Sequence, residues 1–78
     1  MQSLHCDYRG YTITASVESH PGIPTPYAGG CLITDPQGHT GTRRSLPLSM
    51  AWMSDLENAQ HASLAHGRWL VDQQLAKH

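Results

Sequence analysis

The chain has 78 residues, 14% of them charged and 38% hydrophobic, with a formal net charge of −1 when the histidines are neutral. This length predicts one small domain over residues 1–78, with a thin stability margin that oligomerisation often supplements. One Lys and four Arg make too few cations for general nucleic-acid binding, and the absence of a long apolar run or signal-peptide core predicts a cytoplasmic, bacterial-type protein without a membrane segment.

Two strands are expected at the start of the chain, over 3–8 and 11–18. The second alternates apolar and polar residues, which places one set on the core face and the other toward solvent. Arg9-Gly10 between the strands suits a tight two-residue turn, because Gly tolerates positive φ. The core-facing residues of the second strand are expected to be Tyr11, Ile13, Ala15 and Val17.

A connector and a third strand follow. Residues 19–26 contain three prolines and a glycine, which predict a loop. The third strand is expected over 27–34, where Gly29-Gly30 indicates a bulge or close approach by a helix.

The segment before the helix contains a turn and a fourth short strand. The sequence Asp-Pro-Gln-Gly over 35–38 is a turn signal. The fourth strand is expected over 39–46 and ends at Pro47. The apolar residues that follow it are expected to close one end of the core.

One long helix is predicted over 55–75, capped by Ser54 with Glu57 at the capping-box position. The glycine at position 67 predicts close contact with the sheet, opposite Tyr11 or Gly30, because Gly in mid-helix costs up to about 1 kcal/mol against Ala. Helical spacing predicts that one apolar face covers the sheet. Its members are Leu56, Ala59, Ala62, Ala65 or His66, Trp69 and Leu70.

These elements predict an α+β fold: an antiparallel meander of three or four strands with one C-terminal helix packed across one face. The other sheet face is then bare. It faces solvent or pairs with a second copy of the chain.

No catalytic or metal-binding constellation stands out. Cys6 and Cys31 are expected to be two buried thiols, although a disulfide would be possible in an oxidising compartment. His5 and His61 complete no ligand set with usual zinc spacing. Because no ordered nucleophile motif or carboxylate pair is present either, we expect no enzyme, no cofactor and no metal.

The residues singled out for partner contact lie before the helix. Trp52 is the best single candidate if it is exposed, with Met50 and Met53 beside it, because aromatics and Met are enriched in interface cores. Arg43-Arg44 could bind an acidic partner or an anion. The plainer interpretation is a charged sheet edge that blocks aggregation.

Two segments resemble a known family. Tyr8-Arg9-Gly10-Tyr11-Thr12-Ile13 resembles the Y-x-G-Y-x-I hairpin of small proteobacterial proteins of unknown function. The segments 59–62 and 67–72 resemble the closing helix of the same proteins, whereas the Pro-rich middle departs from the pattern. The resemblance implies a sheet-plus-helix domain and transfers no catalytic residue.

The leading functional hypothesis is a small non-catalytic protein-interaction or regulatory module, with a homodimer or an unidentified protein as its assembly partner. The alternative is a nucleic-acid-binding module that uses the sheet face. That alternative requires Arg9, Arg43 and Arg44 to share one face of the sheet.

Overall fold

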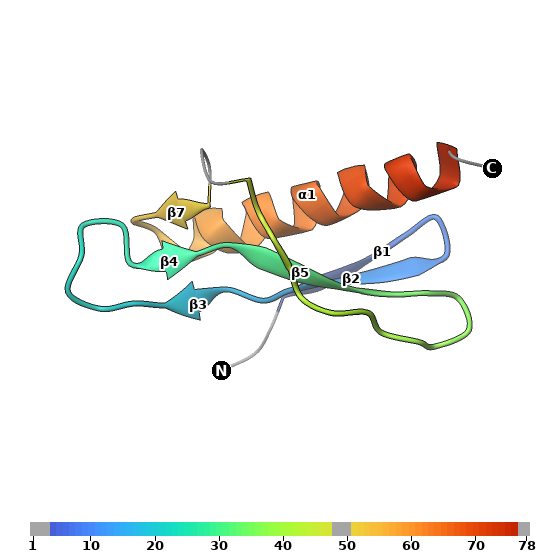
Figure 1. Cartoon of the computed structure of the whole chain (residues 1–78), viewed down its shortest axis with the longest axis horizontal. Helices are drawn as coiled ribbons and strands as arrows, with labels where there is room; N and C mark the ends of the chain where they lie inside the picture. Colours follow the sequence, from blue (N-terminus) through green and yellow to red (C-terminus); the bar gives the residue numbers. More distant parts are fainter. Residues whose placement is uncertain (1–3, 48–50, 77–78) are drawn as a thin grey trace.

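The computed structural model describes residues 4–47 and 51–76. Figure 1 shows the single helix lying along the long axis of the molecule, on one side of the strands. The elements in chain order are β1 (His5–Tyr8), β2 (Tyr11–Ala15), β3 (Glu18–Ser19), β4 (Tyr27–Ala28), β5 (Gly30–Thr34), β6 (Arg44–Ser45), β7 (Trp52–Met53) and α1 (Leu56–Ala76). The predicted α+β fold, with a C-terminal helix packed across the sheet, is confirmed.

The main sheet is an antiparallel meander in the order β1-β2-β5-β6. Arg9 and Gly10 have φ values of 52° and 86°, so the first hairpin closes through the tight turn that the sequence predicts. The predicted fourth strand is shorter than 39–46. It consists of β6, preceded by an isolated bridge between Thr40 and Thr34.

A second sheet was not predicted. The strands expected over 11–18 and 27–34 each divide in two, and their outer pieces form a small sheet with β7 in the order β3-β4-β7. Arg43 accounts for the break, because its guanidinium donates to Ser16 O at 2.8 Å and Ala28 O at 3.2 Å. These carbonyls lie where the strands separate. Because β7 comes from the apolar segment between Pro47 and α1, this connector supplies a strand to the second sheet.

Strand register decides which side chains face the helix. Residues directly opposite each other in antiparallel strands project to the same face of a sheet. Cys6 lies opposite Ile13, and Cys31 lies opposite both Ala15 and Arg44. Since Ile13, Ala15 and Cys31 are buried in the core that α1 covers, Arg44 projects to this helix-side face as well.

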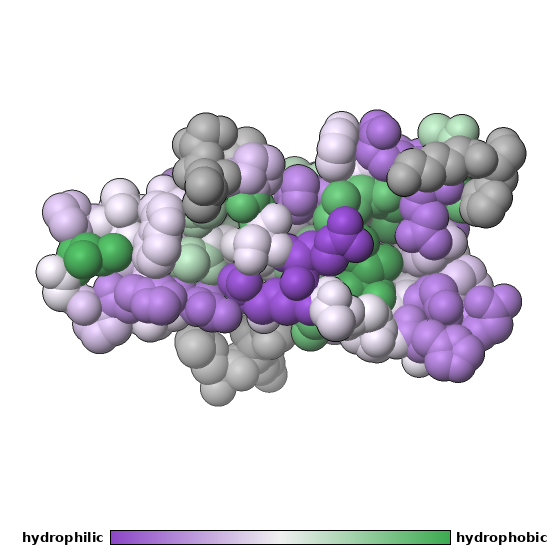
Figure 2. Space-filling model, viewed as in Figure 1, coloured by the Kyte–Doolittle hydropathy of each residue, from purple (hydrophilic) through white to green (hydrophobic). Residues whose placement is uncertain are grey.

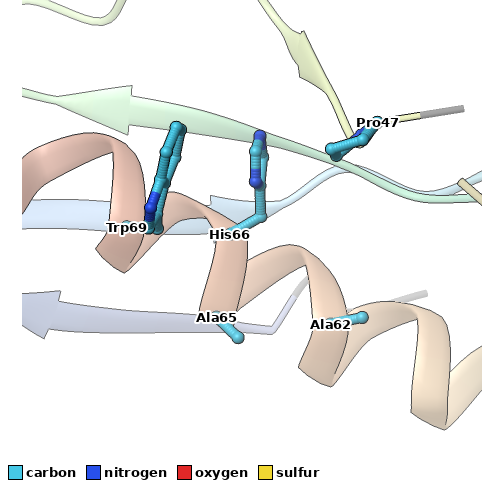
Figure 3. Close-up of a pocket in the computed structure, with 5 residues that line it drawn as sticks. All are labelled: Pro47, Ala62, Ala65, His66 and Trp69. Atoms are coloured by element: carbon cyan, nitrogen blue, oxygen red, sulfur yellow. The ribbon is translucent and has the colours of Figure 1, made fainter. Parts of the chain in front are cut away.

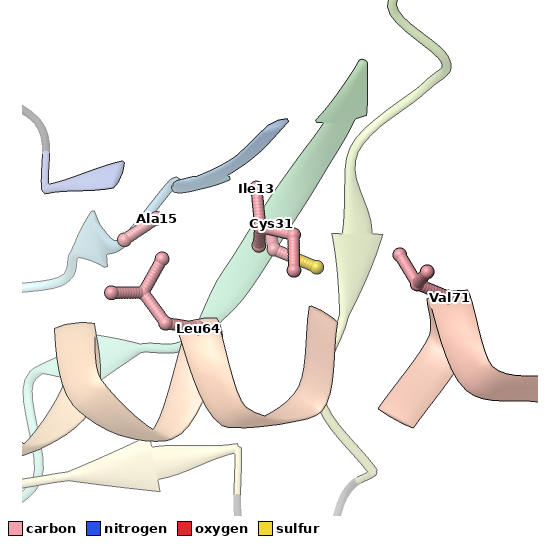
Figure 4. Packing of buried hydrophobic residues seen from close by; sticks show 5 residues of the cluster. All are labelled: Ile13, Ala15, Cys31, Leu64 and Val71. Carbon is pink, nitrogen blue, oxygen red and sulfur yellow. The ribbon is translucent and has the colours of Figure 1, made fainter. Parts of the chain in front are cut away.

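The core is small and lies between α1 and the helix-side face of the main sheet. Figure 4 shows strand residues from β2 and β5 meeting Leu64 and Val71 of the helix. A Cβ added at Gly67 would lie 2.3 Å from Ile13 Cγ2, so the close approach expected at Gly67 is opposite Ile13 and not opposite Tyr11 or Gly30. The helix therefore needs Gly at this position to reach the sheet.

The helix begins one residue later than the capping prediction requires. Asp55, not Ser54, acts as the cap: its carboxylate accepts from Glu57 N–H at 3.3 Å, and its carbonyl accepts from Ala59 N–H at 3.0 Å. Acidic charge at this position also suits the helix dipole.

Within residues 4–47 and 51–76, no helix, α1 included, is both long enough and apolar enough to cross a membrane.

Candidate interaction surface

The apolar face predicted for α1 is only partly the buried face. Of the predicted set, Ala59 is fully buried, but Trp69 is 54% exposed. Five residues of α1 are buried. Four of them recur every four positions and are small or β-branched: Ala59, Ser63, Gly67 and Val71. Leu64 is the fifth, and it packs in the core beside this row. The prediction is therefore wrong for Trp69, whereas Ala62 is half-buried. Of the predicted alternatives Ala65 and His66, Ala65 is exposed and His66 is half-buried. Small side chains let the helix approach the sheet closely, whereas the Trp69 ring is displaced to the outside.

These displaced residues line an open apolar groove of about 520 Å³. We call it the helix groove, and it is lined by Pro47, Ala62, Ala65, His66 and Trp69. Figure 3 shows the rings of His66 and Trp69 side by side on α1, with Pro47 on the far side of His66. The two rings stack with centroids 5.7 Å apart and planes inclined by 14°. The groove thus has a firm aromatic wall at one end and small side chains along the helix.

An adjoining hollow extends the helix groove past Trp69 toward the sheet. It has a volume of about 470 Å³ and combines apolar with polar side chains. Figure 2 shows apolar surface exposed between the helix and the sheet, next to a strongly hydrophilic strip. The residues lining this hollow are Ile33, Arg44, Trp69, Leu70, Gln73 and Gln74. Trp69 is common to both depressions and stands at their junction.

His66 has a perturbed titration because of its place in this groove. Partial burial, and secondarily the positive charge of Arg44, lower the pKa of His66 below its ordinary value. Both influences disfavour the imidazolium form. His66 is therefore an apolar-like, neutral member of the groove at neutral pH.

The partner-contact residues predicted from sequence do not gather at one site. Trp52 is 42% exposed on β7. Its ring forms a T-shaped pair with that of His20, with centroids 5.1 Å apart, and Met53 is half-buried beside it. Met50 lies outside the described residues. Only Arg44 reaches the surface around Trp69, where it lines the adjoining hollow.

Arg43 has a structural role that the sequence did not indicate. Its Nε and Nη2 atoms donate to Ser16 O at 3.0 and 2.8 Å, and its Nη1 lies 3.6 Å from Glu18. A Cβ on Gly30 would lie 2.5 Å from this guanidinium. Gly30 is thus required for the approach of Arg43, and the pair Arg43-Arg44 is divided between two faces of the sheet.

The condition for a nucleic-acid-binding sheet is not met. Arg9 lies in the first turn and donates to Asp72 Oδ1 at 2.8 Å. Arg43 is engaged by backbone carbonyls, and Arg44 projects to the helix-side face. The three cations do not form one basic surface that could follow a phosphate backbone.

Hydrogen bonds from Tyr8 and Arg9 to Asp72 join the first hairpin to the helix. From the sequence alone, Asp72 was expected to be a lone acid near the helix end. Tyr8 OH donates to the two carboxylate oxygens at 2.9 and 3.0 Å, in addition to the hydrogen bond from Arg9. The Arg9 hydrogen bond first, and then that of Tyr8, lower the pKa of Asp72. All three groups are used in holding the fold together.

The described residues offer little material for catalysis or metal binding. Cys6 and Cys31 are free thiols on strands separated by β2, and burial raises the pKa of Cys31. Within the described residues, 4–47 and 51–76, no three His, Cys, Asp or Glu side chains lie close enough together to hold a metal ion. The helix groove is therefore the best-developed surface feature from which to argue a function.

Comparison with known proteins provides no relative to guide the assignment. No family model, no curated protein and no solved structure matches this chain. The hairpin and helix motifs noted in the sequence consequently remain a resemblance.

Proposed function

We propose that this chain is a non-catalytic protein-interaction module that docks its partner in the helix groove. The observation that carries the proposal is the position of Trp69, a large aromatic residue 54% exposed beside apolar side chains on a regular helix. Trp is the residue most often found at interface hot spots, and such residues act by filling apolar pockets on the other protein. A small domain gains little from exposing Trp69 unless another surface covers it.

The chemistry of the groove favours a protein partner over a small ligand. Its volume of about 520 Å³ would admit a small molecule. Ligand pockets, however, combine apolar walls with several converging polar groups that fix orientation. Here the imidazole of His66 is the one polar side chain among the lining residues that the structure describes. An apolar side chain on a protein surface fits this lining better than a polar metabolite does.

The thiols support a cytoplasmic location for the module. Cys6 and Cys31 lie on β1 and β5 with β2 between them, a separation of about 10 Å at ordinary strand spacing. That distance is too long for a disulfide, whose Cα atoms are usually less than about 7 Å apart. Two unbridged cysteines in a small domain suit a reducing compartment.

Site-specific photo-crosslinking in the producing cell tests the proposal. A benzoylphenylalanine replaces Gln73, which is exposed beside Trp69, and in a matched variant it replaces His5, which is exposed on β1. We expect a discrete protein adduct from position 73 and none from position 5. The same adduct should disappear when Trp69→Ala is added. The proposal fails if position 73 gives no adduct, or if the adduct survives the loss of Trp69.

A further inference from the structure

We propose that the partner in the helix groove is a second copy of this chain, with the two α1 helices antiparallel and Trp69 of each copy seated against Ala62 and Pro47 of the other. This inference rests on the proposed function and names its partner. Three observations support it: the spacing of bulky and small residues along α1, the lack of charge on this stripe, and the surface that the single chain leaves exposed.

The spacing makes the helix complementary to itself. Ala62 and Trp69 are seven residues apart, so they lie about 10 Å apart along the axis and within about 20° around it. A two-fold axis midway between them, near Ala65 and His66, brings Trp69 of each copy opposite Ala62 of the other. The bulky ring then faces the smallest side chain of the groove. A parallel arrangement would oppose Trp69 to Trp69 and leave both alanines uncovered.

Charge does not oppose this pairing. Among the described residues that line the helix groove there is no carboxylate and no Lys or Arg, and His66 is biased toward its neutral form. Like charges brought together at an interface would disfavour self-association. The nearest full charge lining these depressions is Arg44, which belongs to the adjoining hollow on the sheet side of Trp69. A strongly acidic or basic partner would find no matching charge inside the groove.

The surface area of the single chain is also consistent with a dimer, because it exceeds the area expected for a folded monomer of its mass. The chain of 8.6 kDa exposes 5132 Å², whereas folded monomers of this mass expose about 4,700 Å². The 21 residues of α1 span about 31 Å, so one helix stripe and its flanks provide a contact at or below the standard size of about 800 Å² per partner. We therefore expect a weak, concentration-dependent dimer with a dissociation constant in the micromolar range.

A residue swap tests both the partner and its orientation by sedimentation equilibrium at neutral pH. Trp69→Ala should weaken dimerisation at least about tenfold, because it empties the groove of the second copy. Ala62→Trp should also weaken it, because two bulky rings then meet. The double variant Ala62→Trp/Trp69→Ala should recover most of the lost affinity, since each copy again opposes a Trp to an Ala.

The control is the other exposed tryptophan. Trp52→Ala removes a comparable ring from β7, which contributes no residue to the lining of the helix groove, and should leave the dimer unchanged. Thermal unfolding by circular dichroism verifies that every variant is folded. A monomeric wild-type chain, or a swap that fails to restore the dimer, overturns this inference. If position 73 still crosslinks to a protein of another mass, the interaction module stands and only the identity of its partner is wrong.

Discussion

Ser63 shows how one polar side chain attaches the helix to the sheet. It is fully buried, its Oγ accepts from Gly30 N–H at 3.0 Å, and the hydroxyl donates to Ala59 O at 2.6 Å. A Cβ added at Gly29 would lie 3.2 Å from the same oxygen. The two glycines and Ser63 thus form a tight polar contact inside an otherwise apolar interface.

Replacing Ser63 by Ala should destabilise the protein by about 1–3 kcal/mol, because the buried Gly30 N–H loses its acceptor. Ser54→Ala provides the matched control. Ser54 is exposed and does not cap the helix, so its loss should change the free energy of unfolding by less than about 0.5 kcal/mol. Urea unfolding of both variants gives the two values. Equal effects would contradict the roles assigned to Ser63 and to the Asp55 cap.

The sequence predicts only some of these contacts. Gly29-Gly30 indicated a close approach by the helix, and Gly29 does face Ser63 and Leu46. Ser63 itself gave no signal, because a serine in mid-helix is usually a solvent-exposed residue. Arg43 was interpreted as an edge charge, since nothing in a linear sequence shows that two separating strands will leave carbonyls for it to bind.

At the scale of elements, the helix was located correctly but rotated about its axis. The length of α1 follows from periodicity, and the β1-β2 hairpin at the start of the chain follows from turn chemistry. Both predictions agree with the structure. The buried stripe was misassigned at Trp69, because hydrophobicity gives a tryptophan more weight than the serine at position 63 or the glycine at position 67. The four-residue recurrence of small or β-branched residues from Ala59 to Val71 was the signal that could have identified the contact face.

Gly67→Ala tests whether close packing or helix propensity dominates at this contact. Propensity alone would stabilise the helix by up to about 1 kcal/mol. The added Cβ would meet Ile13 Cγ2 at 2.3 Å in a fully buried site, and overpacking of this kind costs about 1–3 kcal/mol. We expect a net loss of stability of about 1–2 kcal/mol in urea unfolding.

The control for this glycine is Gly41→Ala. An added Cβ at Gly41 meets nothing within 4 Å, so this variant should be neutral or slightly stabilising. A stabilised Gly67→Ala variant would show that α1 does not lie as close to β2 as the structure places it.

At the scale of the whole molecule, the sheet is wider than one helix can cover. Four strands span about 14 Å between their outer axes, and α1 packs mainly on β2 and β5 near the middle. The helix-side surface toward β6 therefore remains open beside Trp69, where Ile33 and Arg44 lie. Because α1 leaves this part of the sheet uncovered, the surface beside Trp69 is a candidate docking site.

Acid should weaken the dimer through His66. Its lowered pKa means that the folded chain binds this proton at a lower pH than the unfolded chain, whose value is near 6.5. The contribution of neutral His66 to the stability of the folded chain is therefore present above about pH 6.5 and is lost as the pH falls through the lower folded value. The charged group that faces it is Arg44 from β6, and Trp69 stacks on it from α1. In the dimer, contact with Ala65 of the second copy would remove more water from the imidazole and disfavour the imidazolium further. Protonation of His66 should therefore oppose dimerisation as well as folding.

The most direct measurement is sedimentation equilibrium of the unmodified chain over a range of micromolar concentrations, at about pH 7.5 and again at about pH 5.5. We predict a monomer–dimer equilibrium at the higher pH, with an average mass that approaches twice the 8.6 kDa of one chain as concentration rises. At the lower pH the average mass should fall toward that of the single chain. A mass of one chain at all concentrations and at both pH values would contradict self-association through Trp69.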